Sequence, residues 1–554
     1  MKKKLLSLLL VAIMMMSVFS SSAMASYDGE NLAVCLASEP QSIDPALNSA
    51  VDGAVMLQHF FEGLMKWEDS GVIYDYTTIN KAVVAPGQAE SYEKVVNADG
   101  TVTYTFKLRE DAKWSDGQAV TANDFVYTWQ RLANPETAAD YCYMIDMVVG
   151  YADVNSGKAE PSALGVKAVD DKTFEVVISY DCPYFLEIAA FPATFPVRQD
   201  IVTADPDNWT RNEGQYISNG PWKLGEWVHN SYIKAVPNEH HYDVANLGPS
   251  SITFQLMDDA NAILAGYKAG DLNYIQEVPV DEIPTLLADG SLYIMDYVGT
   301  YYVTYQTQKA PFDDPLVRKA FTLAIDSKYI AEQVAQAGQV PAAGFVPAGI
   351  ADADPTADDF RTTGGDYWDV PLDDETYKAN CELAREALAE AGYANGEGFP
   401  VVTYLYNTND AHKAIGEALQ QMWKTELGVT VQLQNQDWAS FLESRKNGEF
   451  DIARNGWIAD YNDPITFLDM WLTGGGNNDA QYVNPEYDAA IANAKATADP
   501  VKRMAYLHEA EDILMKQDWT LAPIYFYTQT CMIDPAIEGV FYTPLGYTIF
   551  GYAK

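Results

Sequence analysis

The chain contains 554 residues, 48% of them apolar, so it can bury a large core, and its length suggests two to four domains. Its 35 Lys and Arg residues against 78 Asp and Glu give a formal net charge of −43, which argues against binding to nucleic acid or to an anionic membrane surface. Five widely spaced cysteines without a CxxC pair, and only six histidines, argue against redox motifs and multi-histidine metal sites.

The first 25 residues have the pattern of a secretory signal peptide. Three lysines precede an apolar run over 5–19, shorter than the ~20 residues of a membrane span, and Ala23-Met24-Ala25 is a small-x-small cleavage site. We therefore expect an exported mature chain that begins at Ser26, without a transmembrane segment, on the periplasmic or extracellular face of the cell envelope. A lipid anchor would need Cys35, but Val34 is a poor residue before a lipidated cysteine, and the strand-like surroundings predict a buried thiol.

Helical and strand-like patterns are intermixed along the mature chain. The strand-like segments are 102–108, 173–178, 232–236 and 301–306, and the helical ones are 124–132, 315–335, 374–391 and 410–427. Asp410 is a candidate N-cap of the last helix, and Asn97-Ala98-Asp99-Gly100 predicts a hairpin turn. Strands and helices mixed without a strict βαβ rhythm predict α/β domains with mixed sheets.

The most informative stretch, 454–464, is Arg-Asn-Gly-Trp-Ile-Ala-Asp-Tyr-Asn-Asp-Pro. It predicts a strand that ends in a turn-prone run after Asp460. Gly456 has no Cβ and lets another backbone approach closely, and Trp457 offers a flat apolar wall. Such a site would suit a free peptide, with its amine on Asp460 and its main chain along the strand. The alternative is that Asp460 is a solvated loop carboxylate.

Motifs for catalysis or metal binding fit poorly. The run His508-Glu509-Ala510-Glu511-Asp512 resembles HExxH, but Asp512 stands where the second histidine belongs, and the sequence has no GxSxG or Walker A motif. The acidic residues Asp352, Asp354, Asp358 and Asp359 could bind calcium weakly or form a solvated loop. We therefore expect a protein that is not an enzyme and needs no cofactor or metal.

An ordered set of short motifs carries a family resemblance. The set comprises Leu108-Arg109, Lys113-Trp114-Ser115-Asp116-Gly117, Thr121-Ala122-Asn123-Asp124-Phe125-Val126, Asn219-Gly220 and Val317-Arg318, followed by Gln436-Asp437-Trp438 and the 454–464 stretch. Each motif is weak, but their order resembles family 5 of the solute-binding proteins, and within it the oligopeptide receptors of ABC importers rather than nickel or sugar receptors.

The resemblance implies a three-lobed, periplasmic-binding-protein-like α/β fold of type II, with mixed sheets and hinge closure around the ligand. The implied division is 1–25 signal peptide, 26–66 first segment of lobe I, 67–217 lobe II, 218–298 second segment of lobe I, 299–527 lobe III and 528–554 final segment of lobe I. A peptide would lie extended and bond to protein backbone, with roomy wet pockets for varied side chains.

The resemblance also implies roles for individual residues. Asp460 would hold the peptide's α-amine, and Gly456, Trp457 and Ile458 would pair with its main chain. Arg454 and His412 would meet its carboxylate. Val51 and Tyr141 would make contacts from lobes I and II, and Trp438 would form a pocket wall. Ser49 departs from the glutamate that relatives can carry, which leaves ligand length and C-terminal preference open. His412 could instead face solvent, and Arg454 could form a structural salt bridge.

These inferences predict a monomeric receptor that binds short peptides and delivers them to the membrane permease of an ABC importer. Two alternatives stay open: a receptor of the same fold for dipeptides, peptide signals or another small solute, and a secreted acidic hydrolase. Ligand length, side-chain preference, affinity, surface anchoring and the disulfide state are not determined by these patterns.

Overall fold

The structure is a computed structural model that describes residue 27 and residues 29–74, 77–211, 214–354, 356 and 358–554. The expected signal peptide, residues 1–25, and the expected new N-terminus at Ser26 lie outside the described residues. Within them, every helix is too short or too polar to serve as a membrane span. All five cysteines are free thiols, and Cys35 is buried in strand β1, as expected.

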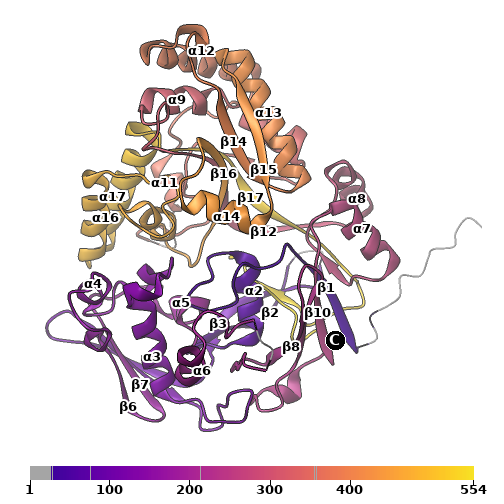
Figure 1. Cartoon of the computed structure of the whole chain (residues 1–554), viewed down its shortest axis with the longest axis vertical. Coiled ribbons are helices and arrows are strands. Elements are labelled where there is room, and N and C mark those ends of the chain that lie inside the picture. The colour runs from indigo at the N-terminus through magenta and orange to yellow at the C-terminus, as the bar shows by residue number, and fades with distance from the viewer. Residues whose placement is uncertain (1–26, 28, 75–76, 212–213, 355, 357) are drawn as a thin grey trace, which may run out of the picture.

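One mixed sheet of eleven strands runs through the molecule (Figure 1). Its order is β15-β14-β16-β12-β17-β11-β1-β10-β9-β8, with β13 paired to β17. The strands are β1 Asn31–Ala37, β8 Trp222–Val228, β9 Tyr232–Pro237, β10 Ser251–Leu256, β11 Tyr274–Ile275, β12 Tyr293–Tyr305, β13 Val340–Pro341, β14 Val402–Asn407, β15 Val431–Gln436, β16 Ile452–Ile458 and β17 Leu521–Ile533. The two longest, β12 and β17, are antiparallel and connect the lower and upper parts of the molecule in Figure 1.

Two four-stranded sheets complete the lower part, in the orders β19-β18-β3-β2 and β4-β5-β7-β6. Their strands are β2 Met65–Ile73, β3 Asn80–Pro86, β4 Ala89–Val96, β5 Val102–Leu108, β6 Val166–Asp170, β7 Thr173–Ile178, β18 Phe541–Tyr542 and β19 Thr548–Ile549. The expected hairpin is confirmed, because β4 and β5 are antiparallel neighbours joined by residues 97–101. Parallel and antiparallel pairs occur together, which confirms the mixed α/β class.

The helices are α2 Val51–Phe60, α3 Ala122–Ala133, α4 Tyr151–Asn155, α5 Phe185–Ile188, α6 Gln199–Ala204, α7 Ala260–Ala269, α8 Ile283–Asp289, α9 Pro315–Leu323, α10 Ser327–Tyr329, α11 Phe360–Gly364, α12 Asp374–Glu390, α13 Asp410–Leu427, α14 Trp438–Lys446, α15 Ile465–Leu468, α16 Pro485–Ala496 and α17 Pro500–Asp512. Helix α3 begins with a capping box, in which the Thr121 amide donates to Asp124 over 2.8 Å. Two expectations are wrong. The segment 315–335 is interrupted after Leu323, and the N-cap of α13 is Asn409, not Asp410.

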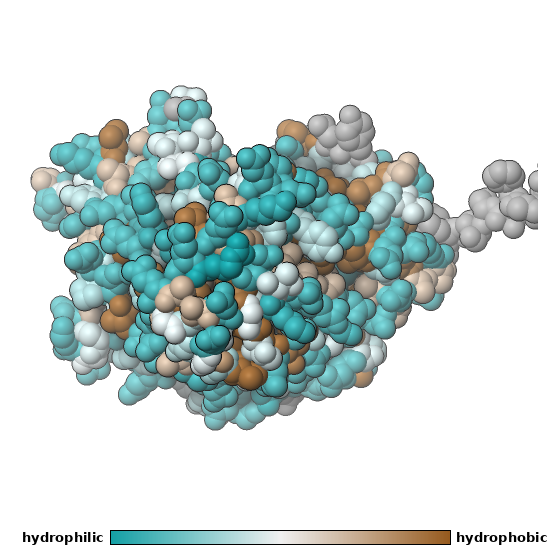
Figure 2. Space-filling view, turned by 90° about the horizontal axis from the view of Figure 1, so that it is seen from above, coloured by the Kyte–Doolittle hydropathy of each residue, from teal (hydrophilic) through white to brown (hydrophobic). Residues whose placement is uncertain are grey.

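The core divides into apolar clusters that hold the long strands in place. In the upper part, α9, α12 and α13 pack on the sheet around Trp423, Phe321 and Tyr404, all fully buried. The surface, by contrast, is dominated by hydrophilic residues on the face seen in Figure 2. A rigid sheet therefore positions the residues at its strand ends, including the segment that follows β16.

Candidate functional site

A cavity of about 740 Å³ lies between the lower and upper parts of the molecule. That volume is in the range of small-ligand sites. Its lining comes from the end of β1, the start of α2, loops near residues 140 and 210, the end of β11, the start of α13, α14, β16 and the C-terminal region. All nine residues named from the resemblance line it: Val51, Tyr141, His412, Trp438, Arg454, Gly456, Trp457, Ile458 and Asp460.

Strand β16 presents a free edge to this cavity. On one side its whole length pairs with β12, from Ile452 with Tyr305 to Ile458 with Gly299. On the other side β14 pairs only with Ile452 and Ala453. From Arg454 to Ile458 that edge has no strand partner among the described strands. The Gly456 N–H already donates to Asn455 Oδ1 over 2.8 Å, and the other backbone N–H and C=O groups on this edge are available to an added strand.

Gly456 leaves room for a neighbouring side chain of the protein itself. A Cβ built there would lie 2.3 Å from the hydroxyl oxygen of Tyr527, a side chain that also lines the cavity. The expected reason for this glycine was close approach by another backbone. The structure adds a second reason, because β17 projects Tyr527 across the strand at this point.

Asp460 is a buried carboxylate that directly follows β16 and is 7% exposed. Tyr141 donates to its Oδ1 over 3.3 Å, and the Thr466 hydroxyl donates to its Oδ2 over 3.1 Å while accepting from its backbone N–H over 3.0 Å. Burial raises the pKa of Asp460 well above its usual value, and these hydrogen bonds oppose that rise. No Lys, Arg or His of the described chain lies within 4.0 Å of it. A carboxylate held this way gains most from a cation that arrives with a ligand.

Arg454 and His412 lie at the other end of the free edge. The Arg454 guanidinium stands 5.4 Å from the ring centroid of Tyr301, and the Tyr301 hydroxyl lies 3.4 Å from His412 Nδ1. Among the described residues Arg454 has no carboxylate within 4.0 Å, so the structural salt bridge is not observed. His412 is half-buried rather than solvent-facing, and burial, with the Arg454 charge, lowers its pKa well below the usual value. Arg454 thus carries the positive charge here, and His412 is neutral.

The sequence and the fold both have close counterparts among known proteins. A family model described as bacterial extracellular solute-binding proteins, family 5 Middle, matches residues 83–479. The chain belongs to this family. Oligopeptide-binding protein OppA of Bacillus subtilis is 33% identical over 528 residues, which cover 94% of this chain and 91% of that protein.

Solved structures of similar proteins agree with the fold of this one. OppA of Haemophilus influenzae in complex with the peptide RPPGFSPFR overlaps with a TM-score of 0.85 at 32% identity, covering 95% of this chain and 99% of that one. The murein tripeptide-binding protein MppA in an unliganded open form gives 0.59 at 33% identity, covering 94% and 95%. Because identity and coverage are nearly equal in the two comparisons, the difference in TM-score reflects how the parts of the molecules are arranged. The present structure has the arrangement of the peptide complex.

Two cavity carboxylates of this family 5 protein were missed from the sequence. Glu277 follows β11, is half-buried and accepts a hydrogen bond from Asn409 Nδ2 over 3.3 Å. Burial and the charge of Asp258 raise the pKa of Glu277 to about 7, and the positive charge of Arg454 opposes this rise. Asp52 lies in the first turn of α2, where an acidic residue is usually explained by the helix dipole. No sequence signal separates these two from the many dispersed surface acids.

The acidic loop considered as a calcium site has other partners. Asp352 Oδ2 lies 2.9 Å from His508 Nε2, Asp354 accepts from Thr356, and Asp359 caps α11. No cluster of three or more potential metal ligands occurs in the part of the chain that the structure describes.

Proposed function

We propose that this protein is an extracellular receptor that captures short peptides in an extended conformation and delivers them to an ABC importer. The observation that carries the proposal is the free edge of β16, which borders the cavity and ends at a buried carboxylate without a cation. A peptide that adds a strand to this edge gains main-chain hydrogen bonds without any requirement on its side chains. The names of the similar proteins, oligopeptide-binding protein among them, support this reading.

The two ends of the edge suit the two charges of a free peptide. Asp460 would receive the α-amine, and Arg454 would receive the carboxylate, with His412 as an uncharged hydrogen-bonding partner beside it. Val51 and Tyr141 would contact the peptide from the opposite wall, and Trp438 would bound a side-chain pocket. These roles follow from position along the cavity, where all of these residues lie.

The proposed division into lobes uses the boundaries given above, with lobe I assembled from 26–66, 218–298 and 528–554. Strands β12 and β17 connect the lower and upper parts and pair along most of their length, so they are natural hinge elements. We infer a monomer that works with membrane permease subunits, is not an enzyme, and is exported by removal of residues 1–25.

Ligand capture tests the proposal directly. The purified protein is denatured, and small molecules released from it are identified by mass spectrometry. Calorimetry with peptides that have free termini follows. Extended peptides among the released molecules and saturable binding support the proposal. Release of a non-peptide solute instead would favour the same-fold alternative, and cleavage of the added peptide, seen by chromatography, would favour a hydrolase.

A further inference from the structure

The cavity carries an excess of negative charge. Among the described residues, nine carboxylates line it, against four Arg and Lys side chains. The carboxylates belong to Asp44, Asp52, Asp140, Asp207, Asp258, Glu277, Glu443, Asp460 and Asp479, and the cations to Arg211, Arg445, Lys446 and Arg454. His412 adds no charge, because its pKa is lowered. A ligand that enters this cavity therefore meets a field that favours cations.

Ion pairs within the protein account for part of this excess. Asp44 pairs with Arg131 at 2.7 Å, Asp140 with Lys446 at 2.7 Å and Asp479 with Arg445 at 2.7 Å. Of the remaining carboxylates, those of Asp207, Asp258 and Glu443 are exposed and screened by water. Three carboxylates sheltered from solvent remain, at Asp52, Glu277 and Asp460. Among the described residues Arg454 is the one sheltered cation of the cavity that has no carboxylate partner.

A zwitterionic peptide does not neutralise this set. Its amine compensates Asp460, and its carboxylate compensates Arg454. Glu277 then keeps only a reduced field from Arg454, because the peptide carboxylate offsets that charge. Asp52 is then left without positive charge from either the protein or the peptide termini. Leaving a sheltered carboxylate uncompensated is costly, so a further positive charge on the ligand is favoured.

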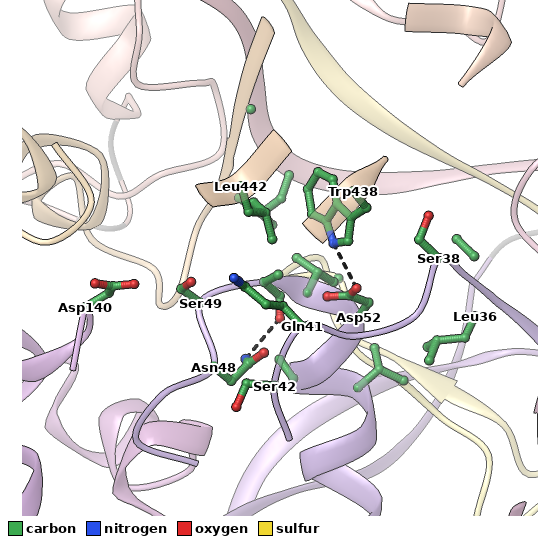
Figure 3. Close-up of a pocket in the computed structure, with 18 of the residues that line it drawn as sticks. Leu36, Ser38, Gln41, Ser42, Asn48, Ser49, Asp52, Asp140, Trp438 and Leu442 are labelled. Atoms are coloured by element: carbon green, nitrogen blue, oxygen red, sulfur yellow. Dashed lines mark hydrogen bonds between the residues drawn. The ribbon is translucent and has the colours of Figure 1, made fainter. Parts of the chain in front are cut away.

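The geometry of Asp52 suits a ligand cation. Its Oδ1 accepts from the Gly53 N–H over 2.8 Å and its Oδ2 from Trp438 Nε1–H over 3.0 Å, across the cavity. Figure 3 shows Trp438 and Leu442 on one wall, opposite Asp52 and Ser49. Each carboxylate oxygen keeps a further acceptor position. Burial raises the pKa of this acid to about 6, so it is mostly ionised at pH 7.5.

The wall opposite Asp52 suits the methylenes of a long side chain. The Trp438 indole stacks on Phe441, with ring centroids 5.9 Å apart, and Leu442 is 9% exposed beside it. A lysine or arginine stem can lie along such an apolar surface while its charged head reaches a carboxylate. An apolar wall facing one carboxylate therefore matches the amphipathic form of these two side chains.

We propose that the cargo is a basic peptide, and that Asp52 selects a lysine or arginine side chain of it. The inference rests on the proposed function, since it assigns a residue preference to the same cavity. It is compatible with broad acceptance at other positions, because one half-buried ion pair contributes less than a fully buried one.

The test is calorimetry at pH 7.5 with alanine peptides of three and five residues that carry lysine at one position, each paired with a norleucine peptide. Norleucine keeps the methylenes and removes the charge. At one position the wild type should bind the lysine peptide about tenfold more tightly than its norleucine partner, a difference of about 1.4 kcal/mol. In Asp52→Asn, which still offers an acceptor to Trp438, the ratio of these two affinities should fall close to one, while the affinity for norleucine peptides should stay unchanged.

Glu443→Gln is the matched control, because Glu443 lines the same cavity but is exposed, and it should keep the lysine preference. Equal binding of lysine and norleucine peptides at every position would overturn the inference and leave the proposed function standing. A lysine preference that persists in Asp52→Asn would also overturn it, because another group would then receive the cation. If neither peptide class bound, the proposed function itself would be wrong, and this inference with it.

Discussion

The Tyr141 hydroxyl donates a hydrogen bond of 3.3 Å to Oδ1 of Asp460, across 319 positions of sequence. The two residues belong to opposite walls of the cavity, so the bond forms only when the walls are close. The same carboxylate is proposed to bind the α-amine of a peptide. Closure of the cavity and recognition of the peptide therefore converge on one buried group.

Replacing Asp460 by asparagine should remove most peptide affinity and leave the fold intact. Removing one partner of a buried ion pair costs about 3–5 kcal/mol, equivalent to about 100-fold to several-thousand-fold weaker binding. N-acetylation of the peptide should cost as much, and the two losses should not add, because they break one interaction. A calorimetric cycle of both proteins with free and acetylated peptide measures this. Equal binding of free and acetylated peptide by the wild type would refute the amine site.

Peptide affinity should fall as the solution is acidified from pH 8. The pKa of Asp460 is raised by burial, so protonation removes the charge that pairs with the amine. The effect of pH on the stability of the ligand-free fold has the opposite sign. A carboxyl group whose pKa is raised by folding stabilises the folded state fully at a pH below its unfolded-state pKa of about 3.9, and this stabilisation is lost as the pH rises through the folded-state pKa. At pH 8 the melting temperature of ligand-free Asp460→Asn should thus be no lower than that of the wild type. Calorimetric titrations and thermal melts over this pH range test both, and acetylated peptide should show a flatter pH profile.

Substitution of Gly456 by alanine should weaken peptide binding about tenfold and lower the melting temperature. The new Cβ would stand 2.3 Å from the Tyr527 hydroxyl oxygen and push this ring toward the cavity, and overpacking of this kind costs about 1–3 kcal/mol. In a Tyr527→Phe background the same substitution should cost less, because the next ring atom lies at 3.3 Å. Additive effects in this cycle would show that the contact is not the cause.

Interior residues of the peptide should matter little to affinity, apart from the basic position argued above. If pairing along Arg454 to Ile458 carries the binding energy, peptides of one length with scrambled interior sequence should differ by no more than pocket discrimination of about 1–3 kcal/mol. Calorimetry on such a set measures the spread. Variation above about 5 kcal/mol, well beyond that range, would exclude main-chain pairing as the main source of affinity.

The exported protein should begin at Ser26 and carry no lipid. Cys35 is buried in β1, and burial raises the pKa of its thiol to about 12, so acylation there would remove a strand from the main sheet. N-terminal sequencing of the exported protein should read Ser-Tyr-Asp-Gly. A blocked N-terminus at Cys35, with mass for acyl chains, would contradict the prediction.

Local patterns in the sequence determined much of this protein. The strands Val102–Leu108 and Thr173–Ile178 and the helix Asp410–Leu427 have the bounds that periodicity predicts, because hydrophobic spacing is a local property. The order of motifs identified the family, and the residues matched through it all line one cavity. The break after Leu323 was missed, because nothing in the apolar spacing of 315–335 signals it.

Only the tertiary structure decided the electrostatics of the cavity. The free edge of β16 depends on where β14 stops pairing, and the shelter of Asp52 and Glu277 depends on walls from distant segments. A carboxylate's pKa is set by what surrounds it, and in a chain with 78 acidic residues the sequence cannot distinguish a sheltered acid from a solvated one. Asp460 was found because it follows a recognisable strand in a stretch that resembles the family, whereas Asp52 accepts its hydrogen bond from Trp438, which lies 386 residues away.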